Sequence, residues 1–349
     1  MGDSTSSSAP RLGGELPPLG GFAIIDKPPG WTSHDVVAKL RGIFGTRRVG
    51  HAGTLDPMAT GVLVCGVGRA TRLLGYSSGC DKEYLGTVRL GVATDTDDAE
   101  GQIIAERDAS AVRFEQLVTA LAALAAKRTQ RPSSVSAIKV AGQRAYRRVR
   151  AGEQVELAER PVLIGSLELL ASRAGPDSTG GTTLDLDIRV ECSSGTYVRA
   201  IARDLGTSLG VGGHLIALRR TRVGQFGLEL ATALAGASLI NIDEVCRQMF
   251  VPLGLSAAQA VDLSHGRAIG GADIELVPSS DTLVEAGLAP ESVGESSGGT
   301  RDGSRDVLPI DLAPESARAA FAPTGEVVAL VQLHDGCWRP TLVVRPAMG

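Results

Sequence analysis

Short apolar segments bounded by turn-forming residues recur through the first two thirds of the chain. The run at residues 22–25 leads into a Pro-Pro-Gly turn, and the run at 62–65 follows a loop that contains three glycines. Each run is typical of a buried strand. Apolar and polar residues alternate after Tyr84 and again, around a Gly/Ser loop, within 155–191, which predicts further strands.

Helical patterns lie between these strands. Capping residues precede apolar positions at helical spacing at about 33–44, and an Ala-rich amphipathic helix is expected at about 112–126. A shorter helix is predicted at 69–74. Residues 190–206 predict a strand, a Ser-Ser-Gly turn and a helix that Gly206 ends.

The length of 349 residues allows roughly two domains. We expect a disordered Ser-, Gly- and Pro-rich tail at 1–20, a first domain at 21–250 and a second at 251–349. The second domain should contain short strands at 263–269, 325–331 and 338–344. A Gly-, Ser- and acid-rich stretch at about 277–323 interrupts it and is expected to form a flexible loop.

Charge is unevenly distributed along a chain whose formal net charge is −4. Eight Lys or Arg and no acid occur within 116–152, whereas 278–326 contains nine acids and three arginines. Taken alone, a negative net charge does not favour binding to nucleic acid, which is also negatively charged. The basic segment nevertheless suggests a positively charged working surface, because each cation that neutralises a duplex phosphate releases about 0.9 counterion.

Other compositional features narrow the class of protein. The five cysteines and five histidines are scattered, without metal-ligand or disulfide spacing. No apolar run approaches the ~20 residues that span a bilayer, and the polar N-terminus does not fit a signal peptide. We therefore expect no metal, no membrane association and a reduced, cytoplasmic setting.

The loop at 50–63 places a carboxylate, Asp56, just before a buried strand. Pro57 biases Asp56 toward an extended backbone, and the glycines permit a tight turn, so the acid could be held in a fixed pose. Asp-Pro pairs are also ordinary turn formers. These residues alone leave both a catalytic and a purely structural Asp56 open.

The loop resembles the motif GH-x-G-x-LDP-x-A-x-G-x-L of the bacterial tRNA pseudouridine-55 synthases, the TruB family, and meets every fixed position. Further blocks similar to the family follow in the family's order over 21–228. The resemblance implies an α+β pseudouridine-synthase fold, with a mixed, mainly antiparallel sheet flanked by helices and a small C-terminal PUA-like β-barrel. It also implies isomerisation of uridine at position 55 in the T-loop of tRNA by base flipping.

The resemblance also implies roles for individual residues. Asp56 would be the nucleophile, and Arg199 would hold it ionised and oriented. Tyr84 would pack on the target base, although a tyrosine at a strand start is usually a packing residue. Tyr197 and Leu218 would line the substrate pocket.

Two further residues are expected to contact the substrate. His51 would occupy the space that the flipped base vacates or contact the backbone; a hydrogen-bonded structural histidine is the other interpretation. Lys139 lies in the basic segment, which resembles an insertion, at about 127–152, that grips the T-arm. Arg219, Arg220 and Arg222 would support the pocket or contact RNA.

Two alternative functions remain at this point. The chain could be a non-catalytic RNA-binding or RNA-folding protein on the same scaffold. A glycoside hydrolase would need two carboxylates about 5–10 Å apart, and few aromatic residues are available to line a sugar site. The acids within 94–101 do not have the spacing of a calcium-binding loop, and we expect this segment to form a hairpin turn instead. We expect no cofactor and a monomer.

Overall fold

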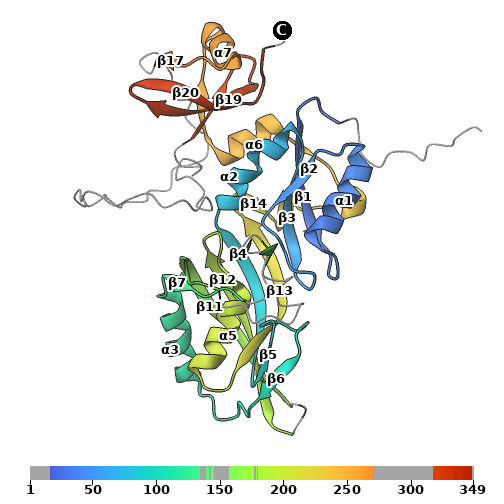
Figure 1. Cartoon of the computed structure of the whole chain (residues 1–349), viewed down its shortest axis with the longest axis vertical. Helices are drawn as coiled ribbons and strands as arrows, with labels where there is room; N and C mark the ends of the chain where they lie inside the picture. The colour runs from blue at the N-terminus through green and yellow to red at the C-terminus, as the bar shows by residue number, and fades with distance from the viewer. Residues whose placement is uncertain are drawn as a thin grey trace, which may run out of the picture. The chain divides into compact units, whose positions relative to one another are not determined.

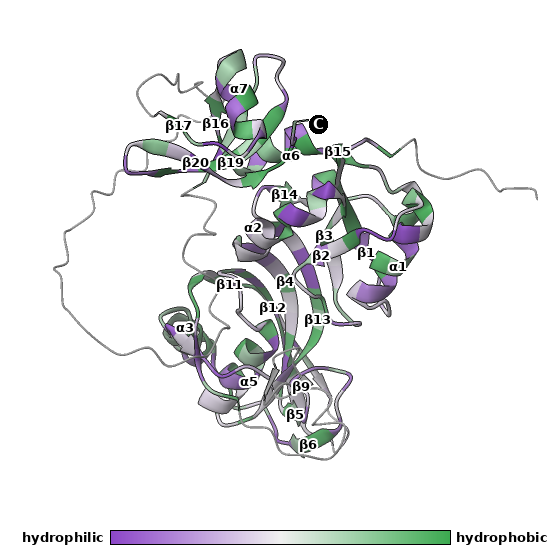
Figure 2. Ribbon diagram, turned by 45° about the horizontal axis from the view of Figure 1, so that its top comes forward, coloured by the Kyte–Doolittle hydropathy of each residue, from purple (hydrophilic) through white to green (hydrophobic). Residues whose placement is uncertain are grey.

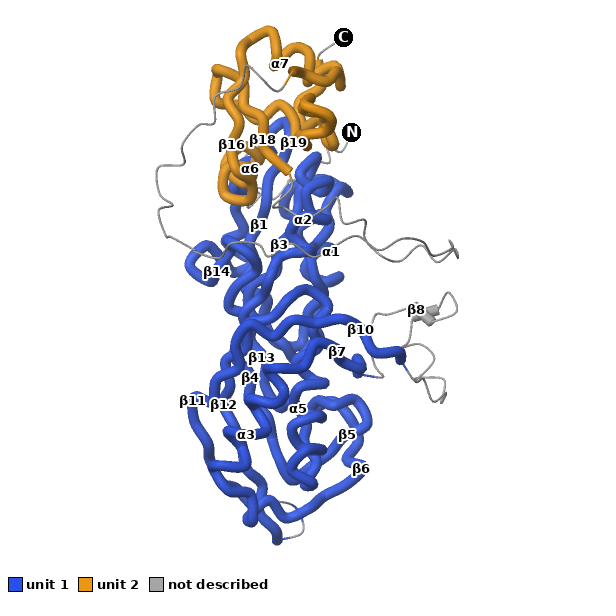
Figure 3. Tube along the Cα trace, turned by 90° about the vertical axis from the view of Figure 1, so that its left-hand side faces the viewer, with its two compact units in different colours: residues 1–241 blue, residues 242–349 orange. Residues whose placement is uncertain are grey.

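The structure is a computed structural model that describes residues 16–133, 139–140, 143–144, 157–176, 178, 180–270 and 317–347. The chain forms two compact units, residues 1–241 and 242–349 (Figure 3). Most of three predicted segments lies outside the described residues. These segments are the tail at 1–20, the insertion at about 127–152 and the acidic loop at about 277–323.

A nine-stranded mixed sheet organises the first unit (Figure 1). Its strands lie in the order β11-β12-β4-β13-β3-β1-β15, with β14 beside β13 and β2 beside β3. All neighbours pair antiparallel except β13 and β3, which run parallel. The strands are β1 (Gly20–Lys27), β2 (Val49–Ala52), β3 (Thr60–Gly68), β4 (Lys82–Leu90), β11 (Ile164–Pro176), β12 (Thr182–Cys192), β13 (Gly213–Val223), β14 (Phe226–Gly227) and β15 (Ile240–Asn241).

Three two-stranded sheets accompany the main sheet in the described part of this unit. They pair β5 (Val92–Thr94) with β6 (Ile103–Glu106), β7 (Thr129–Gln130) with β10 (Arg160–Pro161), and β8 (Lys139–Val140) with β9 (Gln143–Arg144). The β5–β6 pair confirms the hairpin predicted around residues 94–101.

Helices pack against the main sheet and enclose its core. α1 (Ser33–Phe44) contacts β2 and β3, while α3 (Phe114–Ala125) and α5 (Val198–Ser208) contact each other and strands β11, β4 and β13. Apolar residues recur along these strands and helices (Figure 2). The core is fully buried at positions such as Leu40, Leu63, Val88, Leu186 and Leu205. The unit is therefore α+β with a mainly antiparallel sheet, as predicted.

Short helical segments connect these elements. They are η1 (Arg69–Leu73), α2 (Leu74–Gly79), η2 (Leu228–Leu230) and η3 (Leu234–Gly236).

Helix α1 begins where the capping residues predicted it. Thr32 is its N-cap and accepts a hydrogen bond from the Asp35 backbone N–H, while the Asp35 carboxylate accepts from the Thr32 N–H at 2.9 Å. This reciprocal capping box satisfies two backbone donors that the first helical turn leaves unpaired. Gly45 ends the helix in the left-handed conformation.

Helix α5 continues past Gly206, which contradicts the predicted helix end. Gly206 is buried within the helix, and a Cβ added there would lie 2.1 Å from the backbone carbon of Gly212 and 2.2 Å from the nitrogen of Gly213. Glycine at this position therefore permits a close approach between α5 and the start of β13. It does not terminate the helix.

Replacing Gly206 with Ala should lower the free energy of unfolding by about 1–3 kcal/mol, because backbone atoms must move to admit the methyl group. Intrinsic helix propensity alone predicts instead that this substitution raises the free energy of unfolding. Urea unfolding of Gly206→Ala and Gly75→Ala provides the measurement. Gly75 lies in α2, and nothing lies within 4 Å of its added Cβ. Gly75→Ala should raise the free energy of unfolding, because the added methyl group meets no other atoms. An equal rise in Gly206→Ala would show that the backbone does not approach Gly206 closely.

The second unit contains a five-stranded sheet in the order β16-β18-β19-β20-β17, a curled sheet consistent with a PUA-like domain. Its elements are α6 (Ile242–Met249), β16 (Val251–Gly254), α7 (Ala257–Ser264), β17 (Ile269–Gly270), β18 (Arg318–Phe321), β19 (Val327–His334) and β20 (Cys337–Val343). The strand predicted at 263–269 is wrong over its first residues. Ser256 caps α7, and Leu263 on this helix fills the core of the sheet.

Candidate active site

A cavity of about 260 Å³ opens in the first unit where β4, β13, the start of α5 and the loop before β3 meet. Besides Arg220, which was expected to support the pocket or contact RNA, it brings together five residues that the sequence nominated for the site. They are Asp56, Tyr84, Tyr197, Arg199 and Leu218. Residues from four separate parts of the chain therefore converge on one site.

The backbone on both sides of Asp56 is fixed by the turn that joins β1 to α1. The Ser33 hydroxyl accepts from the Leu55 N–H at 2.9 Å and lies 3.2 Å from the Leu55 carbonyl. The Pro57 carbonyl accepts from the Lys27 ammonium at 3.2 Å and from the Gly30 N–H at 2.8 Å. Lys27 is fully buried, and burial lowers its pKa to about 8. The turn therefore holds the residues that flank Asp56.

Arg199 makes a two-pronged contact with Asp56 from the first turn of α5. Its Nε lies 3.0 Å from Asp56 Oδ2, and its Nη2 donates to Oδ1 at 3.3 Å. The geometry fixes the carboxylate plane as well as its position. Arg199 is buried, whereas 35% of the Asp56 side chain is exposed, so the acid is the accessible member of the pair.

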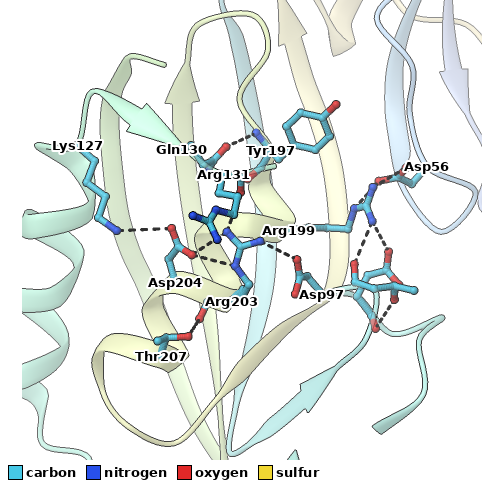
Figure 4. A network of polar contacts seen from close by, with 12 residues as sticks. Asp56, Asp97, Lys127, Gln130, Arg131, Tyr197, Arg199, Arg203, Asp204 and Thr207 are labelled. Atoms are coloured by element: carbon cyan, nitrogen blue, oxygen red, sulfur yellow. Dashed lines mark hydrogen bonds and ion pairs between the residues drawn. The ribbon is translucent and has the colours of Figure 1, made fainter. Parts of the chain in front are cut away.

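The hairpin at 94–101 holds the other side of the Arg199 guanidinium. Arg199 Nη1 lies 3.2 Å from Asp98 Oδ2 and donates to the Thr96 carbonyl at 3.0 Å. In Figure 4 the guanidinium lies between Asp56 and this hairpin. No chemistry was expected of Asp98, because it lies 101 positions before Arg199 in the sequence and only the fold brings the two together.

Burial raises the pKa of Asp56 above the ordinary value of 3.8; Arg199 opposes this shift, and Asp98 adds to it. The resemblance implied that Arg199 keeps Asp56 ionised. Arg199 does favour the carboxylate, but the cost of desolvating the charge is larger, so the net shift is upward. Such a raised pKa is typical of a reactive carboxylate in a cleft.

Tyr84 and Leu218 contribute apolar surface from adjacent strands, and Tyr197 does so from the N-cap of α5. Tyr84 is 7% exposed, and burial raises the pKa of its hydroxyl. Gln130 fixes the Tyr197 backbone by accepting from its N–H at 2.8 Å and donating to its carbonyl at 3.1 Å (Figure 4). Neither the sequence pattern nor the motif match had identified Gln130.

Of the nominated residues whose side chains the structure describes, His51, Arg219 and Arg222 are not among those that line the cavity. His51 lies on β2, where its ring packs edge-on against His34 with 5.7 Å between centroids. Burial lowers its pKa to about 4, so the ring is neutral at physiological pH. The side chain of Lys139 lies outside the described residues.

The described residues contain neither a metal-binding cluster nor a membrane-spanning helix. No group of three or more His, Cys, Asp and Glu side chains there could hold a metal ion. No described helix is both long and apolar enough to cross a membrane.

Comparison with known proteins identifies the scaffold that carries this site. Residues 41–198 match the N-terminal domain of the TruB family pseudouridylate synthases, and residues 199–249 match the C-terminal domain of tRNA pseudouridylate synthase B. The chain belongs to the TruB family. It is therefore a tRNA pseudouridine synthase, an enzyme that isomerises uridine to pseudouridine in tRNA. The alternative of a non-catalytic RNA-binding protein is not favoured.

Individual relatives agree with this assignment. The tRNA pseudouridine synthase B of Arthrobacter sp. (strain FB24) is 45% identical over 333 residues, covering 94% of this chain and 98% of the relative. The tRNA pseudouridine synthase B of Mycobacterium leprae (strain TN) is 54% identical over 260 residues, covering 73% of this chain and 81% of the relative.

Solved structures support the fold over nearly the whole chain. A chain in a structure of an H/ACA RNP bound to a substrate RNA containing 2′-deoxyuridine matches with a TM-score of 0.61 at 19% identity, covering 99% of this chain and 93% of that one. A chain of a Cbf5-Nop10-Gar1 complex matches with a TM-score of 0.59 at 20% identity, covering 99% of this chain and 93% of that one. The chain thus has the pseudouridine-synthase fold.

Proposed function

We propose that Asp56 is the nucleophile of this synthase and that its target is the uridine at position 55 in the T-loop of tRNA. The observation that carries the proposal is the two-pronged contact of Arg199 with a carboxylate that remains partly exposed in the cavity. The fully matched motif around Asp56 supports the same role.

The target uridine must leave its stack to reach Asp56, which costs a few kcal/mol. Tyr84 packs against the extruded base, while Leu218 and Tyr197 close the sides of the pocket. Asp56 then attacks the ribose or the base, or takes a ribose proton. The C1′–N1 bond breaks, the uracil turns over, and C5 joins C1′. Tyr84 assists loss of the C5 proton.

Recognition of the T-arm relies on surfaces outside the cavity. We propose that the basic segment at 116–152, with Lys139, binds the phosphates of the arm, and that His51 occupies the space that the flipped base vacates or contacts the RNA backbone. The second unit acts as a PUA-like RNA-binding domain. The enzyme works as a monomer in the cytoplasm, where its tRNA substrate is found.

The rate of conversion should fall at acid pH with a midpoint above 3.8. The attacking form of Asp56 is the carboxylate, and burial raises its pKa, so protonation removes activity at a higher pH than for an exposed aspartate. Single-turnover rates across an acid pH series measure this midpoint, with circular dichroism in the same buffers to exclude unfolding. A midpoint at or below 3.8 would contradict the raised pKa.

A T-arm hairpin tests the proposed substrate. An isolated hairpin with uridine at position 55 should be converted, and the same hairpin with cytidine there should bind without reaction. Full-length tRNA with that cytidine is the matched control. Pseudouridine formed elsewhere in the cytidine-containing tRNA would disprove the proposed position.

A further inference from the structure

Two cations, Lys82 and Arg220, line the cavity from neighbouring strands and are almost completely buried. Lys82 is 6% exposed and Arg220 is 1% exposed. Neither cation forms an ion pair with a carboxylate among the residues that the structure describes. This arrangement is unusual, because a buried charge normally has an opposite charge beside it.

Carbonyl groups hold both cations in place. The Lys82 ammonium donates to the carbonyls of Ser78 at 3.0 Å and Cys80 at 2.6 Å. Arg220 donates from Nε to the Val62 carbonyl at 2.7 Å and from Nη2 to the Gly53 carbonyl at 3.1 Å. These bonds orient the charges but do not neutralise them. The cavity therefore has a positively charged wall.

The strand register places both cations beside Tyr84, the residue expected to pack against the target base. Arg220 on β13 is the direct cross-strand partner of Tyr84 on β4, so both side chains stand on one face of the sheet. Lys82 precedes Tyr84 by two residues on β4 and lies on that same face. A uracil ring packed on Tyr84 would thus lie next to both cations.

The reaction places negative charge on that ring. When the C1′–N1 bond breaks, its electron pair goes to N1, and the uracil becomes an anion with charge shared among N1, O2 and O4. If Asp56 instead adds to C6, the electron pair moves to O4. C5 then bonds to C1′, the C5 proton passes to a base, and N1 gains a proton. Any bond that Asp56 has formed to C1′ or to C6 breaks, which returns the Asp56 carboxylate. No redox partner is needed in either route.

We propose that Lys82, together with Arg220, stabilises the negative charge that develops on the uracil ring during isomerisation. This inference rests on the proposal that the target uridine enters the cavity at Asp56. Fixed positive charge in a buried site stabilises such an anion without reorganisation at the moment of reaction. A wholly structural role, in which the cations only satisfy carbonyl groups, makes a different prediction for catalysis.

Three variants separate these roles. Lys82→Met removes the charge and keeps the length of the side chain, and Lys82→Arg keeps the charge. Lys39→Met is the matched control on the exposed face of α1. With tRNA at saturating concentration, Lys82→Met should reduce the single-turnover rate about 10²-fold with little change in KM, whereas Lys39→Met should match wild type. Partial recovery in Lys82→Arg would support the role of charge.

The pH dependence gives a readout that a structural role would not change. Burial lowers the pKa of Lys82 to about 8; Arg220 on β13 lowers it further, while Cys80, Cys192 on β12 and Asp81 oppose the shift. As pH rises through about 8, Lys82 loses its charge, so the wild-type rate should fall. This basic limb should be absent in Lys82→Arg. A limb caused by ionisation of the substrate would persist in every variant.

Several outcomes would overturn the inference. Lys82→Met could react as fast as Lys39→Met, or it could raise KM with kcat unchanged. The basic limb could also persist unchanged in Lys82→Arg, which decides the matter even if Lys82→Met does not fold. Asp56→Asn, assayed in parallel, keeps the two proposals distinct. If it is inactive while the Lys82 variants are unaffected, only the charge-stabilising role of Lys82 fails.

Discussion

Replacing Asp56 with Asn should abolish pseudouridine formation while leaving the fold and tRNA binding intact. Asparagine has nearly the same shape, and Arg199 keeps its contacts with Asp98 and Thr96. An amide can neither attack carbon nor accept a ribose proton as a carboxylate does. We expect the rate to fall at least about 10⁴-fold, as is typical when a nucleophile is removed. Single-turnover assays with unmodified tRNA measure the rate, and filter binding measures affinity.

The control for this variant is an exposed carboxylate in the second unit. The side chain of Asp335 is 92% exposed in the turn between β19 and β20, so Asp335→Asn should behave as wild type. Conversion by Asp56→Asn within about tenfold of wild type would rule out the nucleophile role. Loss of tRNA binding would instead show that Asp56 supports the binding surface.

Replacing Arg199 with Met should impair both catalysis and stability. Its guanidinium contacts Asp56, Asp98 and a backbone carbonyl at once, and its loss releases the nucleophile from its fixed orientation. A misplaced reacting group costs on the order of 10²-fold in rate. The buried Asp98 also loses its partner, which costs about 3–5 kcal/mol in the free energy of unfolding. Urea unfolding and single-turnover rates measure the two effects separately.

A double variant distinguishes these two effects. Adding Asp98→Asn to Arg199→Met removes the unpaired buried charge, so part of the lost stability should return. Activity should not return, because Asp56 still lacks its orienting partner. Recovery of activity together with stability would show that Arg199 matters only for folding. An Arg199→Met variant as stable as wild type would contradict the buried pairing with Asp98.

The parts of the fold that local pattern encodes could be predicted from sequence. Capping residues and apolar spacing located α1, and apolar runs located β1 and β3, because these elements follow from nearby residues. Gly206 was misassigned because a helix-ending glycine and a close-packing glycine look alike in sequence. The start of the strand predicted at 263–269 was wrong because Leu263 fills the core equally well from a helix.

The site shows the same division between local and long-range information. Chemistry alone left Asp56 ambiguous, and the motif match made it the leading candidate. Asp98, Lys27 and Lys82 were assigned no role, because a charged residue is normally expected to be solvent-exposed. Their burial beside one cavity follows from strand pairing and from contacts between distant segments, which no local pattern contains.

The central claim is that Asp56 converts uridine 55 of tRNA, and nucleotide-resolution pseudouridine mapping tests it most directly. An unmodified tRNA transcript would be incubated with wild type or with Asp56→Asn and then mapped. We expect one pseudouridine, at position 55, with wild type and none with the variant. Modification at another position, or the same product from Asp56→Asn, would contradict the central claim.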